Sequence, residues 1–121
     1  MTQHQTSSSE LEVTLIPALD DSGKFSPEYQ AVLIDFSRHT KPTSQTAYTM
    51  DAIDAGGGLI GEYAFKATAI ILPAIAAASV AYISGRAGRK IKVKFGDVEV
   101  EAATIEQVEQ AVKLMKKVVK G

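Results

Sequence analysis

The chain has 121 residues, no cysteine, and a net charge of −1 from 13 basic and 14 acidic residues. This length suits a single domain with a modest core. The lack of cysteine excludes disulfides, thiolate metal sites and a thiol nucleophile, and the near-neutral charge argues against general binding to nucleic acid or anionic lipid.

The N-terminal third predicts a leader, a strand and a helix. Residues 1–9 are polar and show no secretory signal, so we expect a disordered leader before a single domain over residues 10–121. Apolar and polar residues alternate over residues 11–16, which predicts a half-buried strand. Ser26 is a suitable N-cap for the helix that follows, and Pro42 is expected to end it.

The next feature is a run of nineteen uncharged residues, seven of them alanine, from Ala67 to Gly85. We predict one apolar helix over about residues 57–85, long enough to span a bilayer and rich in small residues that allow close helix packing. Three environments stay open for it: the interface of an oligomer, a membrane, or the core of a monomer. The residues assigned to this self-association or membrane helix are Gly57, Gly61, Ile70, Ile71, Ala74, Ile75, Ala78, Ala81 and Tyr82.

A basic turn follows the apolar run and is formed by Arg86, Arg89 and Lys90. It contains two glycines, at positions 85 and 88, and no large apolar residue. We therefore predict that the turn is exposed and flexible, which is typical of sites that proteases cut.

The C-terminal third predicts a hairpin over residues 90–102 and a helix over residues 104–120. A two-residue Gly-Asp loop suits a tight hairpin turn and sets a register in which Lys94 faces Glu99. Thr104 begins a capping box for the last helix, because a glutamine follows three residues later.

The predicted order is strand, helix, long apolar helix, strand, strand, helix. The N-terminal strand can bury its apolar side chains only beside the hairpin. We therefore predict an α+β fold with a small three-stranded sheet, made of residues 11–16, 91–95 and 98–102 and covered by helices.

Little in the chain supports catalysis. His4 lies in the leader and His39 at the end of a helix, and neither has the spacing of a metal ligand or a serine–acid arrangement. Gly56, Gly58 and Gly61 match the dinucleotide fingerprint but lack the strand and βαβ unit that it requires. We predict no catalytic residue, no metal, no cofactor and no enzymatic activity.

The order of these segments resembles that of a known family. It consists of a strand (LEVTLIP), a helix (SPEYQAVLIDFSRH), a polar stretch, a glycine-marked apolar helix, a basic turn, a hairpin (RKIKVKFGDVEVEA) and a final helix (TIEQVEQAVKLMKK). Over residues 11–120 this arrangement resembles the effector-associated constant component family of bacterial conflict systems.

The resemblance implies a non-enzymatic accessory or adaptor protein of a bacterial antiviral defence or programmed-death module. Such a protein would form homo-oligomers through its apolar helix and couple to an effector, such as a caspase-like or trypsin-like peptidase. The alternative is a membrane-inserting, permeabilising protein of the holin-like or pore-forming kind. We expect a cytoplasmic location, with membrane association left open, and no nucleic-acid partner.

Overall fold

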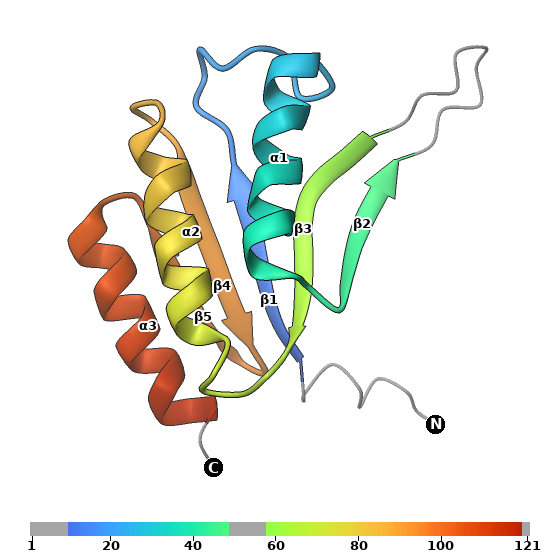
Figure 1. Ribbon diagram of the computed structural model, residues 1–121. Helices are drawn as coiled ribbons and strands as arrows, with labels where there is room; N and C mark the ends of the chain where they lie inside the picture. The colour runs from blue at the N-terminus through green and yellow to red at the C-terminus, as the bar shows by residue number, and fades with distance from the viewer. Residues whose placement is uncertain (1–9, 49–57, 120–121) are drawn as a thin grey trace.

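The computed structural model describes residues 10–48 and 58–119. Figure 1 shows that the described residues form one sheet with helices packed on one of its faces. In chain order the elements are β1 (Glu10–Ile16), α1 (Pro27–Thr40), β2 (Ser44–Tyr48), β3 (Gly58–Lys66), α2 (Leu72–Ser84), β4 (Lys90–Phe95), β5 (Val98–Ala102) and α3 (Ile105–Val119).

The sheet has five strands in the order β2-β3-β1-β4-β5, and all the neighbouring strands are antiparallel. The fold is α+β, but the prediction of a three-stranded sheet is wrong. The N-terminal strand β1 lies at the centre, where it pairs with both β3 and β4. The two strands that the sequence analysis missed, β2 and β3, extend the sheet beyond β1.

The prediction of one long apolar helix over residues 57–85 is also wrong. Its first part is strand β3, and a turn separates that strand from the 13-residue helix α2. In β3 the side chains of Tyr63 and Phe65 are buried and those of Glu62 and Lys66 are exposed, which is the alternation of a strand. Gly61 has a φ of +94°, a left-handed conformation that does not fit a right-handed helix.

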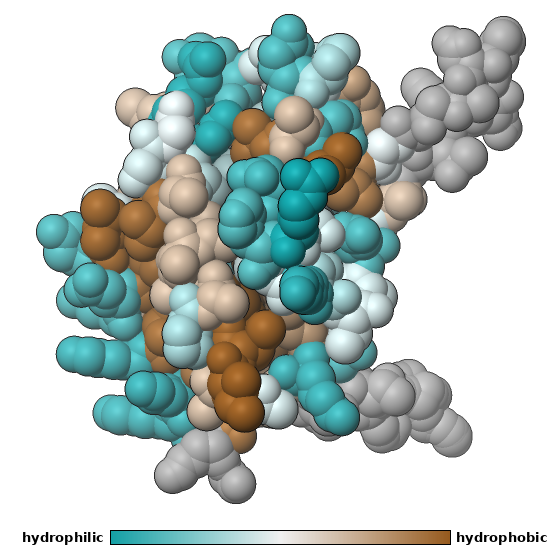
Figure 2. Space-filling view, viewed as in Figure 1, coloured by the Kyte–Doolittle hydropathy of each residue, from teal (hydrophilic) through white to brown (hydrophobic). Residues whose placement is uncertain are grey.

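Helix α2 begins with proline at its first turn and carries no charged residue. Figure 2 shows the helical face of the molecule, where a pale band of small apolar residues over α2 lies beside more polar surface. Among the described helices, none combines the length and the apolar character needed to cross a membrane.

The predicted hairpin is confirmed in its register. Lys94 of β4 lies opposite Glu99 of β5, and Phe95 lies opposite Val98. The start of α1 is confirmed as well, because the Ser26 hydroxyl accepts a hydrogen bond from the backbone N–H three residues later. These features depend on residues close in sequence, which is why they could be predicted.

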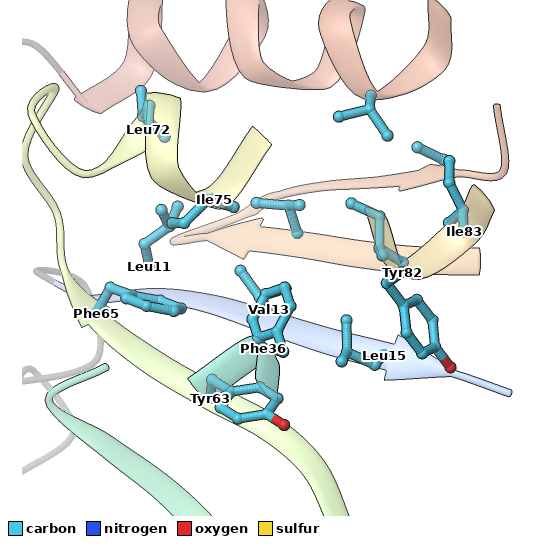
Figure 3. Packing of buried hydrophobic residues seen from close by; sticks show 14 of the residues in the cluster. Leu11, Val13, Leu15, Phe36, Tyr63, Phe65, Leu72, Ile75, Tyr82 and Ile83 are labelled. Carbon is cyan, nitrogen blue, oxygen red and sulfur yellow. The ribbon is translucent and has the colours of Figure 1, made fainter. Parts of the chain in front are cut away.

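The core lies between the sheet and the helices. Leu11, Val13 and Leu15 of β1 point into it, and Figure 3 shows them among apolar side chains from the neighbouring strand β3 and from the helices. Because β1 is central, its inward face is covered by helices along its whole length. The opposite side chains of β1 face away from the helices and form part of an open, polar sheet face.

One buried polar group in this core has no partner in the part of the chain that the structure describes. The hydroxyl of Ser79 is fully buried between α2 and α3, in an apolar environment that includes Ile75, Val108 and Met115. Burying an unpaired hydroxyl costs free energy, because its hydrogen bonds to water are lost and not replaced.

We expect Ser79→Ala to raise the free energy of unfolding by about 1 kcal/mol, since it removes the unpaired hydroxyl and keeps the Cβ atom. Chemical denaturation measures this change. The control is Ser84→Ala, at an exposed position at the end of the same helix, where we expect a change below about 0.5 kcal/mol. A loss of stability in Ser79→Ala would contradict the prediction and show that the hydroxyl contributes favourably.

Candidate functional site

The outer side of α2 and the preceding turn forms an apolar ridge on the surface. We define the α2 ridge as Ile70, Pro73, Ala77 and Ala81, all of which are exposed. Ile70 is the most prominent, with 87% of its surface exposed. Alanines four residues apart leave the backbone of α2 accessible to close approach by another helix.

A groove lies beside this ridge, between α1 and α2, with a volume of about 490 Å³. The α2 side of this α1–α2 groove consists mainly of the alanines at positions 74, 77, 78 and 81. The α1 side includes Val32 and Phe36, and Asp35 and His39 add polar groups. The groove is therefore largely apolar and shallow-walled, which suits an apolar side chain or a helix ridge.

The predicted self-association residues divide into two groups. Ile70, Ala74, Ala78 and Ala81 line the ridge or the groove. Tyr82 is largely buried but also lines the groove. The others contribute little to this surface: Ile75 is buried, Ile71 is half-buried against the core, and Gly61 is buried in β3. Gly57 lies outside the described residues. Because the long helix does not exist, the apolar surface is smaller than the sequence predicted.

Arg89 contradicts the prediction that the basic turn is exposed throughout. Only 8% of its surface is exposed, and its guanidinium donates hydrogen bonds to both carboxylate oxygens of Asp21, at 2.8 and 3.1 Å. A third bond, of 3.0 Å, goes to the backbone carbonyl oxygen of Tyr82. Lys90 and Arg86 are exposed, as expected, although Arg86 contacts Asp20 and Asp21 at 3.3 Å.

These contacts hold two distant loops together. The Arg89 guanidinium also lies over the rings of Tyr82 and Tyr29, 4.7 and 5.8 Å from their centroids, and the two tyrosine hydroxyls are hydrogen-bonded to each other. The side-chain hydrogen bonds from Arg89 lower the pKa of Asp21 below its ordinary value. Burial raises the pKa values of Tyr29 and Tyr82. This cluster forms part of the wall of the α1–α2 groove, since Arg89 and Tyr82 both line it.

The opposite face of the sheet carries a second, polar depression of about 340 Å³, which we call the open-face hollow. Thr14 of β1 and Ala64 of β3 lie in it, and both have shorter side chains than the charged residues around them. The charged residues that line it are Glu12, Glu62, Lys92, Lys94 and Glu99. Residues 44–46 of the edge strand β2 also line it.

The described part of the chain contains no group of three or more histidine, cysteine, aspartate or glutamate side chains arranged to hold a metal ion. His39 contacts Asp35 on the exposed side of α1, at 3.6 Å. No known protein family, curated protein or solved structure matches the chain. Its function must therefore be argued from its two surface depressions and the α2 ridge.

Proposed function

We propose that this chain is a non-enzymatic assembly module of a bacterial defence or programmed-death system. In this proposal it self-associates through the α2 ridge and couples to a partner effector, for which a caspase-like or trypsin-like peptidase is the candidate. The observation that carries the proposal is a surface helix of 13 residues without a single charge. Surface helices normally carry polar residues on their outer side, so an apolar outer side indicates a contact surface.

The ridge and the groove share Ala77 and Ala81, so both lie on one face of the molecule. A twofold axis between two copies would bring the α2 ridge of each copy into the α1–α2 groove of the other. Such isologous contacts are the commonest form of homodimer interface. Two antiparallel α2 helices also place opposite ends of their helix dipoles together, which is favourable.

The α2 ridge is too small to form the whole contact between two copies. A helix of 13 residues is about 20 Å long and about 10 Å wide. One face of such a helix is much smaller than the area of about 800 Å² that a stable interface buries on each partner. The contact must therefore include the flanking helices. Ile34 of α1 and Leu114 of α3 are exposed apolar residues of these helices, with 45% and 39% of their surface exposed.

The proposal includes a cytoplasmic location and no nucleic-acid partner, as the composition predicts. The permeabilising alternative was based on a single continuous apolar helix. That segment is divided between β3, a turn and α2, so no specific observation favours the alternative.

We expect the full chain to run as a dimer or larger species in light scattering coupled to size exclusion, rather than at the monomer mass of 12.9 kDa. Ala77→Glu places a charge on the α2 ridge and should weaken the association by about tenfold or more, because the carboxylate would be buried unpaired in the contact. The expected outcome is a shift to monomer at concentrations where the parent chain is assembled.

Ala47→Glu is the matched control, because Ala47 is an exposed alanine of the edge strand β2, outside the groove and the flanking helices. It should leave the assembly unchanged. A monodisperse monomer for the parent chain at high micromolar concentration would overturn self-association. Equal dissociation in both variants would show that the α2 ridge is not the contact.

A further inference from the structure

The open-face hollow carries acidic groups on β3 and β1 beside basic groups on β4, and this arrangement follows from the strand register. Thr14 of β1 pairs with Glu62 of β3 on one side and with Lys92 of β4 on the other. In the next row facing the same way, Lys94 of β4 lies opposite Glu12 of β1. Two carboxylates therefore lie on β1 and β3 and two ammonium groups lie on β4, with the carboxylate of Glu99 on β5 beyond them.

Most of these charges are not paired with each other. Lys92 contacts Glu99 of β5 at 3.5 Å, on the side away from the glutamates of β1 and β3. Within the described residues, Glu12, Glu62 and Lys94 form no ion pair. The hollow therefore presents acidic and basic groups that are free to bind a ligand of complementary charge.

We propose that the open-face hollow binds a free zwitterionic amino acid. The ammonium group of the ligand would contact Glu12 and Glu62, and its carboxylate would contact Lys94 and Lys92. Ligands with charge of one sign only are disfavoured, because one side of the hollow would repel them. The volume of about 340 Å³ is at the small end of the range for small-molecule sites.

The strand spacing is compatible with a short ligand. Glu62 and Lys92 belong to strands separated by β1, so their backbones are about 9.6 Å apart. The side chains extend from these two positions over the same hollow, where a short amino acid can lie between them. Exposed charge pairs contribute little each, so we expect a dissociation constant of about 1 mM or weaker.

The test is a titration of the full chain with small probes, in which binding is measured by the NMR chemical shifts of the backbone amides. The probes are β-alanine, propionate, which lacks the ammonium group, and ethylamine, which lacks the carboxylate. We expect β-alanine to give saturating shifts in the amides of β1, β3 and β4 around Thr14. The two single-charge probes should bind about threefold more weakly or worse. Equal, non-saturating shifts for all three probes would overturn the proposal.

Variants locate the site and separate it from non-specific charge effects. Lys94→Gln and Glu12→Gln should each weaken β-alanine binding by about threefold or more, and Lys94→Arg should retain it. The controls Lys113→Gln and Glu109→Gln remove one charge of each sign from the exposed surface of α3, and they should leave β-alanine binding unchanged. Unchanged binding in both hollow variants, with melting temperatures equal to the parent, would also overturn the proposal. The α2 ridge lies on the other side of the sheet, so this result is independent of self-association.

Discussion

Replacing Arg89 with methionine is expected to lower the free energy of unfolding by about 3–5 kcal/mol, the range measured when one partner of a buried ion pair is removed. Methionine preserves much of the apolar stem but lacks the guanidinium. The Asp21 carboxylate, only 4% exposed, then loses two hydrogen bonds, and the carbonyl of Tyr82 loses one. Equilibrium denaturation in urea measures the change.

Two comparisons separate the buried charge from a general loss of basic residues. Arg86→Met removes a neighbouring cation whose side chain is 44% exposed, and we expect it to cost no more than about 1 kcal/mol. Adding Asp21→Asn to Arg89→Met should restore part of the lost stability, because it removes a buried charge that has lost its closest partner and keeps only the contact with Arg86. A loss below about 1 kcal/mol in Arg89→Met would show that the pair contributes little.

The pH dependence of stability gives a second measure of the same interaction. The pKa of Asp21 is lowered from its ordinary 3.8 by the hydrogen bonds from Arg89. The stability from this pair is therefore fully present above pH 3.8 and is lost as the pH falls through the lower, folded-state pKa. In Arg89→Met the hydrogen bonds that lower the pKa of Asp21 most are lost while burial still raises it, so this pKa moves back toward its ordinary value. The difference in free energy of unfolding between the parent chain and Arg89→Met should therefore become smaller as the pH falls below 3.8.

Leu33→Ala is expected to cost about 2–5 kcal/mol, because it leaves a cavity in the core. Leu33 is fully buried on the inner side of α1, and its Cδ2 atom would lie 3.6 Å from a Cβ added at Gly61 of β3. Its backbone carbonyl also accepts a hydrogen bond from the buried Tyr63 hydroxyl. The side chain thus packs α1 onto the bend in β3, and thermal or chemical denaturation measures its loss.

The adjacent residue gives a matched control for this substitution. Ile34 has the same number of carbon atoms as Leu33 and lies on the outer side of the same helix, 45% exposed. We expect Ile34→Ala to cost less than about 1 kcal/mol. Similar losses for the two variants would contradict the packing described for α1.

The parts of the fold that could be predicted depend on local patterns. The hairpin follows from strict alternation around a Gly-Asp loop, and α1 follows from its cap and apolar spacing. The alternation in β3 was also present, at Glu62, Tyr63 and Phe65, but the long uncharged run after it favoured a helix. Strand β2 contains no such pattern, because it is a short, polar edge strand that pairs only with β3.

The Arg89 cluster could not be predicted from its surroundings in the sequence. A run of basic residues next to glycines is typical of an exposed turn, and Arg86 and Lys90 follow that expectation in part. Arg89 is buried because its partner Asp21, 68 residues earlier, approaches only when the sheet and helices have formed. The aspartates at positions 20 and 21 are the only hint in the sequence of an acidic partner for Arg89, but no local pattern connects them to it.

The central position of β1 has a consequence for how the chain reaches this fold. The strand is complete by Ile16, yet its partners β3 and β4 end at Lys66 and Phe95. During synthesis, β1 leaves the ribosome before β3 and β4, so its apolar side chains stay exposed to water until both partner strands have been made. Contacts between residues so far apart in sequence slow folding. Synthesis of most of the chain, rather than of its first half, therefore sets the earliest moment at which the core can close.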